Sequence, residues 1–320
     1  MNTNDPLPPF AEEFLIYMEA IAGKSSNTIK EYRHDLLMFF TFLAKRKGLE
    51  HPEDFTEEML KEVTLTDLYA YLNYTNVERS NKAVTRARKV ASIRSFFKYA
   101  VNKAKILKVN PATELDSPKV TKTLPRYLEL EECQQLLSTI DGPHKERDYC
   151  MIVLFLNCGL RLSELVGINI NDIKGDTLVV TGKGDKERTI YLNPSCLEAI
   201  DAYMAVRPRV EEKGEYALFL SNRKQRISDK TVQYTVKKYI KEAGLDANKY
   251  STHKLRHTAA TLMYSYGDVD IRALQEILGH TSVATTEIYT HVKNARIKEA
   301  VGKNPLANYK PEKDEDKENG

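Results

Sequence analysis

The sequence lacks any apolar run long enough to cross a lipid bilayer. Its longest apolar stretch, 150–156, is far shorter than the ~20 residues that a membrane-spanning helix needs. The first ten residues contain acidic and proline residues in place of a basic start and an apolar stretch, so we expect no signal peptide. Cysteine is scarce, with 4 in the chain and no CxxC pair, which favours reduced thiols in a cytosolic protein over a disulfide scaffold.

The chain also lacks a strong net charge. Its 48 Lys and Arg against 45 Asp and Glu give only +3, which by itself does not indicate nucleic-acid binding. The charges are nevertheless segregated: 50–78 holds eight acidic residues and one lysine, whereas 79–108 holds ten basic residues and no acid. A second basic stretch, 223–241, has seven basic residues against one aspartate. Segregated charge is typical of a surface that binds a polyanion, although solvated helix faces produce the same pattern.

What the sequence does contain is enough apolar material for two cores. Hydrophobic residues make up 42% of 320 residues, and domains average roughly 150 residues. We expect residues 1–115 to form a helical domain in which residues 28–31 make a capping box. Its apolar residues recur at helical spacing in four segments, 10–21, 29–43, 65–73 and 84–101. In the last of these, Lys82, Arg86 and Lys89 are predicted to share the polar face.

The second half of the chain predicts a different mixture of elements. Residues 116–127 hold two prolines and little periodicity, which indicates a linker before a domain at 128–308. That domain is expected to contain a helix at 148–157 that is buried all round, and a hairpin of strands 177–181 and 187–192. Further helices are predicted at 195–206, 228–243, 253–266 and 271–278. The acidic end, 309–320, is expected to be disordered. The predicted fold is mainly α with a small β-sheet.

The segment HKLRH could bind a phosphate. On a helix His253 and Arg256 are three residues apart and share a face, where a guanidinium gives paired donors and an imidazole moves protons. A metal pair of His253 and His257 is the rival interpretation, but Lys254 stands where the zincin pattern needs a glutamate. An ordinary polar surface helix is the third.

The segment NCGLRLSEL places an arginine at the junction of two apolar helices. Arg161 is costly to bury there unless it is paired or bound to an anion. Glu164 stands three residues further on and could hold the guanidinium, so a purely structural ion pair explains the pattern as well as a phosphate site does.

Three further residues carry weaker signals when each is taken alone. Lys183 lies in a Gly-Lys-Gly turn without the spacing of a P-loop, and a turn lysine usually faces solvent. His280 follows Leu-Gly, and Tyr289 stands nine residues after it among 18 tyrosines, most of which are packing residues.

Taken in order, these motifs resemble those of one family. GLRLSEL, GKGDKER, HKLRH, LGH and IYTH together are similar to the tyrosine recombinase (phage integrase) family, and especially to its short bacterial Xer-type members. The segments NTIKEYRHDL and IRSFFKYAV look like the family's core-binding, SAM-like domain, which would precede a mixed α+β catalytic domain. The family pattern falls on Arg161, Lys183, His253, Arg256, His280 and Tyr289. One departure is Ala-Ala-Thr-Leu at 259–262, where relatives often have Phe-Ala-Thr-His.

The resemblance implies strand cleavage by transesterification, without a metal and without a cofactor. Tyr289 would attack the scissile phosphate and form a 3′-phosphotyrosyl bond, with His253 as general base. Arg161 and Arg256 would clamp the phosphate, Lys183 would protonate the 5′-oxygen, and His280 would bind the phosphate or position the tyrosine. Glu164 is expected to hold the guanidinium of Arg161 in position without contacting the DNA itself.

The resemblance also implies the partners. We expect double-stranded DNA with an inverted-repeat core site, a tetramer on two such sites, and in some settings a second recombinase or an accessory factor. A helix at 292–301 would dock on the neighbouring subunit, with packing onto its own domain as the alternative. Two alternatives stay open, a type IB topoisomerase-like nicking-closing enzyme and a DNA-binding protein without catalysis. The candidate DNA contacts are Lys82, Arg86, Lys89, Arg94, Lys230, Lys237 and Lys238.

Overall fold

The structure is a computed structural model that describes residues 5–120, 126–182, 187–210, 216–266 and 270–279. The chain divides into two compact units, Met1–Lys122 and Thr123–Gly320, and each is described here by itself. The finer boundaries expected from the sequence, 1–115, 116–127, 128–308 and 309–320, stay predictions. The last of these segments and the expected helix at 292–301 lie outside the described residues.

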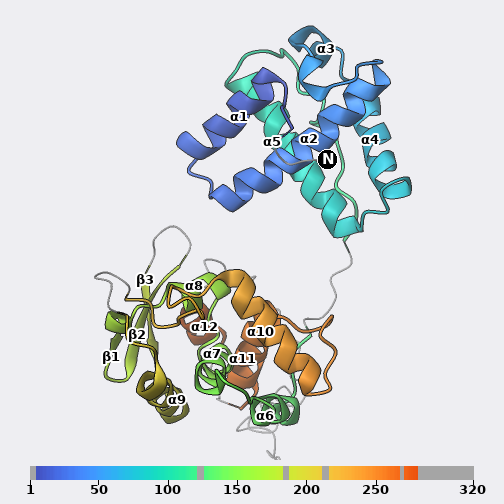
Figure 1. Ribbon diagram of the computed structural model, residues 1–320. Helices are drawn as coiled ribbons and strands as arrows, with labels where there is room; N and C mark the ends of the chain where they lie inside the picture. Colours follow the sequence, from blue (N-terminus) through green and yellow to red (C-terminus); the bar gives the residue numbers. More distant parts are fainter. Residues whose placement is uncertain (1–4, 121–125, 183–186, 211–215, 267–269, 280–320) are drawn as a thin grey trace, which may run out of the picture. The chain divides into compact units, whose positions relative to one another are not determined.

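The N-terminal unit is helical, as predicted (Figure 1). Its elements are α1 (Pro9–Ala20), α2 (Ser26–Arg46), the 3-10 turn η1 (Pro52–Asp54), α3 (Glu57–Lys61), α4 (Leu65–Val77) and α5 (Ala83–Asn102). The expected capping box at residues 28–31 is wrong, because α2 begins earlier: the hydroxyl of Ser25 accepts a hydrogen bond from the amide of Thr28. A reciprocal capping box occurs instead at the start of α4, between Thr64 and Asp67.

Aromatic side chains form the core of this unit. Phe96 of α5 contacts Phe40 of α2 and Phe14 of α1, with ring centroids 5.4 and 5.7 Å apart and the rings edge to face. All three rings are almost completely buried. Edge-to-face pairs add to the free energy of burying the rings, so these contacts hold α1, α2 and α5 together.

Lys89 lies inside the N-terminal unit, and its expected place on the polar face of α5 is wrong. It is 1% exposed, and its ammonium group lies 2.9 Å from the carboxylate of Asp35 in α2. Arg88 and Ser92 donate hydrogen bonds to the same carboxylate, at 2.6 and 2.8 Å. A buried carboxylate requires such partners, and the aspartate on α2 therefore draws the lysine inward.

The other predicted basic residues of α5 lie nearer the surface. Lys82 is exposed just before the helix, and Arg86 is half-buried. Arg94 is exposed overall, but its guanidinium donates a hydrogen bond to the carbonyl of Leu115. Among the four predicted DNA contacts of this unit, Lys82 is the one that is exposed and lies outside α5.

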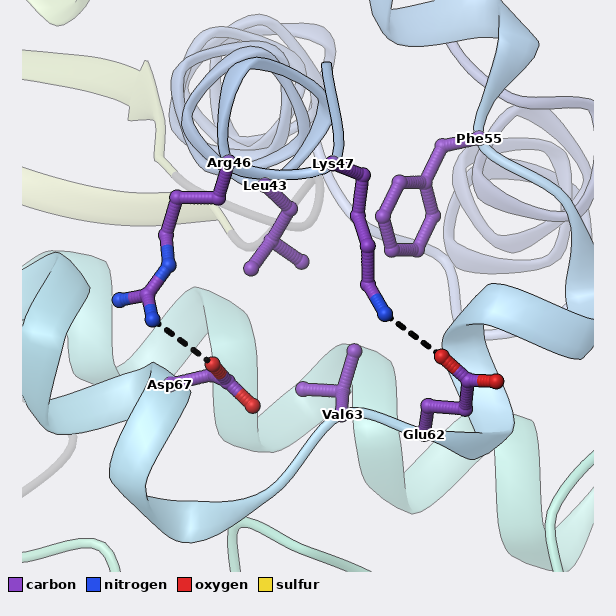
Figure 2. A pocket seen from close by; sticks show the side chains of 7 residues that line it. All are labelled: Leu43, Arg46, Lys47, Phe55, Glu62, Val63 and Asp67. Atoms are coloured by element: carbon purple, nitrogen blue, oxygen red, sulfur yellow. Dashed lines mark hydrogen bonds and ion pairs between the residues drawn. The ribbon is translucent and has the colours of Figure 1, made fainter. Parts of the chain in front are cut away.

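A cavity of about 250 Å³ lies at the end of α2 in this unit (Figure 2). Arg46 faces Asp67 across 3.6 Å, and Lys47 faces Glu62 across 2.6 Å. Its basic side chains are therefore matched by acidic ones, and the cavity has no surplus charge to attract an anion.

The C-terminal unit consists mainly of helices, with a small sheet at one side (Figure 1). Its helices are α6 (Leu130–Ser138), α7 (Lys145–Cys158), α8 (Leu162–Gly167), the 3-10 turn η2 (Ile170–Asp172), α9 (Pro194–Val206), α10 (Asp229–Glu242), α11 (Thr252–Tyr266) and α12 (Ile271–Leu278). As predicted, α7 is buried along most of its length, and it packs against α9 and α11. No helix in the described part of the chain is long and apolar enough to span a membrane.

The sheet is antiparallel with strand order β1-β2-β3, where β1 is Ile173–Lys174, β2 is Thr177–Thr181 and β3 is Glu187–Tyr191. The predicted hairpin is confirmed, with Val180 paired to Arg188. Strand β1 was not predicted, because a strand of two residues shows no alternation.

The buried carboxylate of Asp35 provides a test of the N-terminal fold. Asp35→Ala leaves a buried lysine without a partner, and we expect it to lower the free energy of unfolding by about 3–5 kcal/mol. Glu31→Ala is the control, because Glu31 pairs with Arg88 at the surface, and we expect a loss below about 1 kcal/mol. Hydrogen exchange of the α2 and α5 amides in the full chain measures both losses. Equal effects would contradict a structural role for the buried cluster.

Candidate active site

Three arginines converge on one buried carboxylate in the C-terminal unit. Glu164, on α8, is 2% exposed. Arg161 donates from Nη1 to Oε1 at 2.5 Å, which is the contact that the sequence spacing predicts. Arg188 on β3 donates to Oε2 at 2.8 Å, and Nη1 of Arg256 on α11 lies 3.7 Å from Oε2. The backbone amide of Arg161 also donates to Oε2, at 2.8 Å, so the carboxylate fixes both the start of α8 and the guanidinium groups.

The carboxyl group of Glu164 is ionised despite its burial. Burial by itself raises its pKa, but the Arg161 amide and the charges of Arg188 and Arg161 together hold the pKa below its ordinary value. The site therefore contains three formal positive charges and one negative charge. This leaves a surplus of positive charge at the edge of α8.

The same arginines bind the carboxyl end of α12. Arg188 donates to the carbonyl of Ile277, Arg256 to that of Leu278 at 2.5 Å, and Arg161 to that of Gly279 at 2.9 Å. The last carbonyls of a helix have no partner within it and carry partial negative charge, so guanidinium groups are favourable ligands for them. The three side chains therefore connect α12 to Glu164.

Two glycines allow this close approach. Gly159 ends α7 and Gly279 ends α12, each with a left-handed φ of about 60°. A Cβ at Gly279 would lie 2.8 Å from Cδ of Arg188, and one at Gly159 would lie 2.9 Å from Leu278. The carbonyl of Gly159 also accepts a hydrogen bond from Arg256 at 2.6 Å. Both positions therefore require glycine for conformation and for space.

His253 lies on α11 near this arginine cluster. Its Nε2 is 3.1 Å from Nε2 of His257, so one ring donates and the other accepts. Partial desolvation lowers the pKa of His253 below its ordinary value, and the charges of Arg256, Lys254 and Arg161 lower it further. The imidazole is consequently neutral at pH 7. The described residues contain no cluster of three or more His, Cys, Asp or Glu that could hold a metal ion.

The structure brings together Arg161, His253 and Arg256 of the six predicted catalytic positions. Lys183, His280 and Tyr289 lie outside the described residues. In the sequence Lys183 stands between β2 and β3, and His280 directly follows Gly279.

Sequence reasoning missed Arg188. A signal was available, because alternation along β3 places Arg188 on the same face as the buried Ile190. An arginine on the buried face of a strand requires an anionic partner, and Glu164 is that partner.

The basic residues predicted on α10 are at the surface. Lys230 and Lys237 are exposed, and Lys238 is 40% exposed beside Glu242. Their expected contacts with DNA stay predictions.

Comparison with known proteins shows which protein family the chain belongs to. Residues 126–296 match the model of the phage integrase family, and residues 11–104 match the SAM-like N-terminal domain of phage integrases. The chain therefore belongs to the phage integrase family, the tyrosine recombinases. It is 56% identical to tyrosine recombinase XerC of Caldanaerobacter subterraneus subsp. tengcongensis over 309 residues, which are 94% of this chain and 88% of the relative. It is 36% identical to tyrosine recombinase XerD of Proteus mirabilis, with 90% of each chain covered.

Solved structures show the same fold. The crystal structure of XerH site-specific recombinase bound to difH substrate matches with a TM-score of 0.69, 23% identity, and 91% of this chain and 84% of that chain covered. The crystal structure of a lambda integrase tetramer bound to a Holliday junction matches with a TM-score of 0.65 and 18% identity over 85% and 76% of the two chains. At these identities the likeness concerns the fold.

The close contact at Gly279 leads to a prediction for stability. Gly279→Ala and Gly175→Ala both place a side chain at a φ near +60°, which costs about 1–2 kcal/mol. A Cβ at Gly175 meets nothing within 4 Å, whereas one at Gly279 meets Arg188. We therefore expect Gly279→Ala to lose a further ~1–3 kcal/mol through overpacking. Urea unfolding of the full chain measures the difference, and equal losses would contradict the contact.

Proposed function

We propose that this chain is a site-specific DNA recombinase that cuts and rejoins duplex DNA through a 3′-phosphotyrosyl intermediate and exchanges strands through a Holliday junction. The observation that carries the proposal is the cluster of three arginines around Glu164, with a neutral imidazole beside it. The 56% identity to a tyrosine recombinase supports it.

The arginine cluster is suited to a phosphodiester. One carboxylate offsets only part of the charge of three guanidinium groups, so an anion at the open side of Arg161 is attracted. Arg161 keeps 34% of its side chain exposed, and we assign to it the contact with a non-bridging oxygen. Arg256 is assigned to the other oxygen. Both stabilise the extra negative charge that develops as the phosphate becomes pentacoordinate.

The proposed chemistry exchanges one ester for another. The phenol oxygen of Tyr289 attacks phosphorus, its proton passes to His253, and the P–O5′ bond breaks with a proton from Lys183. His280 is assigned to the phosphate or to the position of the tyrosine. The phosphotyrosyl bond stores the energy of the broken phosphodiester, so the proposed reaction uses neither a cofactor nor a metal. Attack by the 5′-hydroxyl of a partner strand reverses these steps and completes the exchange.

The proposed substrate is duplex DNA with an inverted-repeat core site, bound by four copies of this chain on two sites. The relatives support this assembly, since lambda integrase has been captured as a dimer on a core site and as a tetramer on a Holliday junction. Chromosome dimer resolution and the movement of a mobile element both fit this substrate, with or without a second recombinase or accessory factor. Such DNA lies in the bacterial cytoplasm, where we place the protein.

The nucleophile provides the first test of this function. Tyr289→Phe removes the attacking oxygen, so we expect DNA binding to persist while the covalent adduct disappears. The adduct is trapped on a nicked suicide substrate and detected on a denaturing gel.

Wild-type protein and Tyr266→Phe are the controls, because Tyr266 is an exposed tyrosine at the end of α11. An adduct in Tyr289→Phe would show that another residue is the nucleophile. A two-site plasmid then separates the alternatives: exchanged DNA indicates a recombinase, whereas relaxed circles alone indicate a topoisomerase-like enzyme.

The lowered pKa of His253 predicts the pH dependence of cleavage. A base acts in its neutral form, and the lowered pKa keeps that form dominant down to pH values below the ordinary ~6.5. Single-turnover cleavage at saturating DNA is therefore expected to fall as the pH decreases, with the midpoint of that fall below the ordinary ~6.5.

His253→Gln is expected to be slow and to lose this inflection. His144→Asn is the control, because His144 is an exposed histidine before α7, and its profile is expected to match wild type. An inflection above pH 7 in the wild-type protein would contradict the assignment of His253 as the base.

A further inference from the structure

Within the described part of the chain, Arg188 leaves one buried donor unpaired, although its other donors make structural contacts. Its side chain is 14% exposed, its Nη atoms reach Glu164 and the carbonyl of Ile277, and its buried Nε has no hydrogen-bond partner among the described residues. A buried donor without a partner is unfavourable, and a buried ion pair is often no more stable than packed apolar side chains. Stability alone therefore does not explain an arginine at this position.

The hydrogen bonds that each carboxylate oxygen of Glu164 accepts indicate the role of Arg188. Each carboxylate oxygen has about two lone pairs that accept hydrogen bonds. Oε2 receives the backbone amide of Arg161 and Nη2 of Arg188, both at 2.8 Å, so its lone pairs are filled. Oε1 receives Nη1 of Arg161 at 2.5 Å.

Arg256 is the one of the three arginines that does not hydrogen-bond to the carboxylate of Glu164. Its Nη1 lies 3.7 Å from Oε2, which is beyond hydrogen-bond distance, and it donates instead to Gly159 at 2.6 Å. Its charge is nevertheless attracted to the carboxylate. A vacant lone pair on Oε2 would allow the guanidinium of Arg256 to move toward Glu164.

We propose that Arg188 is a positioning residue that occupies Oε2 of Glu164 and thereby keeps the guanidinium of Arg256 in place for the scissile phosphate. The inference rests on the proposed function, in which Arg256 binds a non-bridging oxygen. Arg188 itself contacts no reacting atom in this account. It acts through Glu164, and its removal matters because Oε2, which lies 3.7 Å from Nη1 of Arg256, then has room for that guanidinium.

The test compares Arg188 variants with and without the charge of Glu164. Arg188→Met is expected to slow single-turnover cleavage at saturating DNA by at least ~10-fold, a part of the ~100-fold that loss of one charge-stabilising donor causes. Affinity for a DNA half-site is expected to change by less than ~3-fold, because the defect lies in the cleavage step. Arg188→Lys, which can still donate to Oε2, is expected to recover most of the rate.

The Glu164→Gln background distinguishes positioning from packing. Without the carboxylate charge, the guanidinium of Arg256 is not attracted toward residue 164. Adding Arg188→Met is therefore expected to slow cleavage by less than ~3-fold. Arg207→Met is the matched control, since Arg207 also donates to backbone carbonyls of this unit but does not contact Glu164. Its effect is expected to be the same in both backgrounds. Circular dichroism verifies that each variant is folded.

A second measurement does not depend on cleavage. The Nε–Hε signal of Arg256 in a ¹⁵N–¹H NMR spectrum, assigned by its loss in Arg256→Lys, is expected to shift in Arg188→Met and to stay unshifted when Arg188→Met is added to Glu164→Gln. An equal slowing of cleavage by Arg188→Met in both backgrounds, or an unshifted signal, would overturn the inference. Absence of a covalent adduct with wild-type protein would overturn the proposed function, while the NMR signal would still decide the position of Arg256.

Discussion

The ion cluster at Glu164 is the interaction on which the rest of the candidate site depends. Three guanidinium groups lie within 4 Å of one carboxylate that is almost completely buried. Without that carboxylate the arginines would repel one another in a medium of low polarity. With it they remain close together and retain a surplus of positive charge. A phosphodiester needs such a surplus most when its own negative charge increases during the reaction.

The same cluster connects distant parts of the chain. Arg161 precedes α8, Arg188 belongs to β3 and Arg256 to α11, and all three donate to consecutive carbonyls at the end of α12. The left-handed glycines at 159 and 279 leave the space that these contacts need. In the sequence Lys183 stands between β2 and β3, and His280 follows Gly279. Arg188 on β3 and the arginine contacts at the end of α12 therefore adjoin both predicted catalytic residues along the chain.

Sequence patterns predicted most of the helices, the hairpin and the contact between Arg161 and Glu164, because each depends on spacing along one segment. The short α3 was not predicted. They did not predict that Arg188 and Arg256 share the same carboxylate, since that requires knowing which strand and helix meet at α8. Lys89 was misplaced for the same reason: its own helix offers a polar face, and only the position of Asp35 on α2 explains its burial. The hairpin register is what makes Arg188 an inward residue.

The central claim is that the arginines act on the negative charge of the scissile phosphate. The most direct measurement is single-turnover cleavage by Arg256→Ala and wild-type protein on two suicide substrates, one with a normal scissile phosphate and one with a neutral methylphosphonate. If the guanidinium offsets charge on a non-bridging oxygen, the loss of rate caused by Arg256→Ala is at least ~10-fold smaller on the neutral substrate, within the range that one such donor contributes. An equal loss of rate on both substrates would contradict the account.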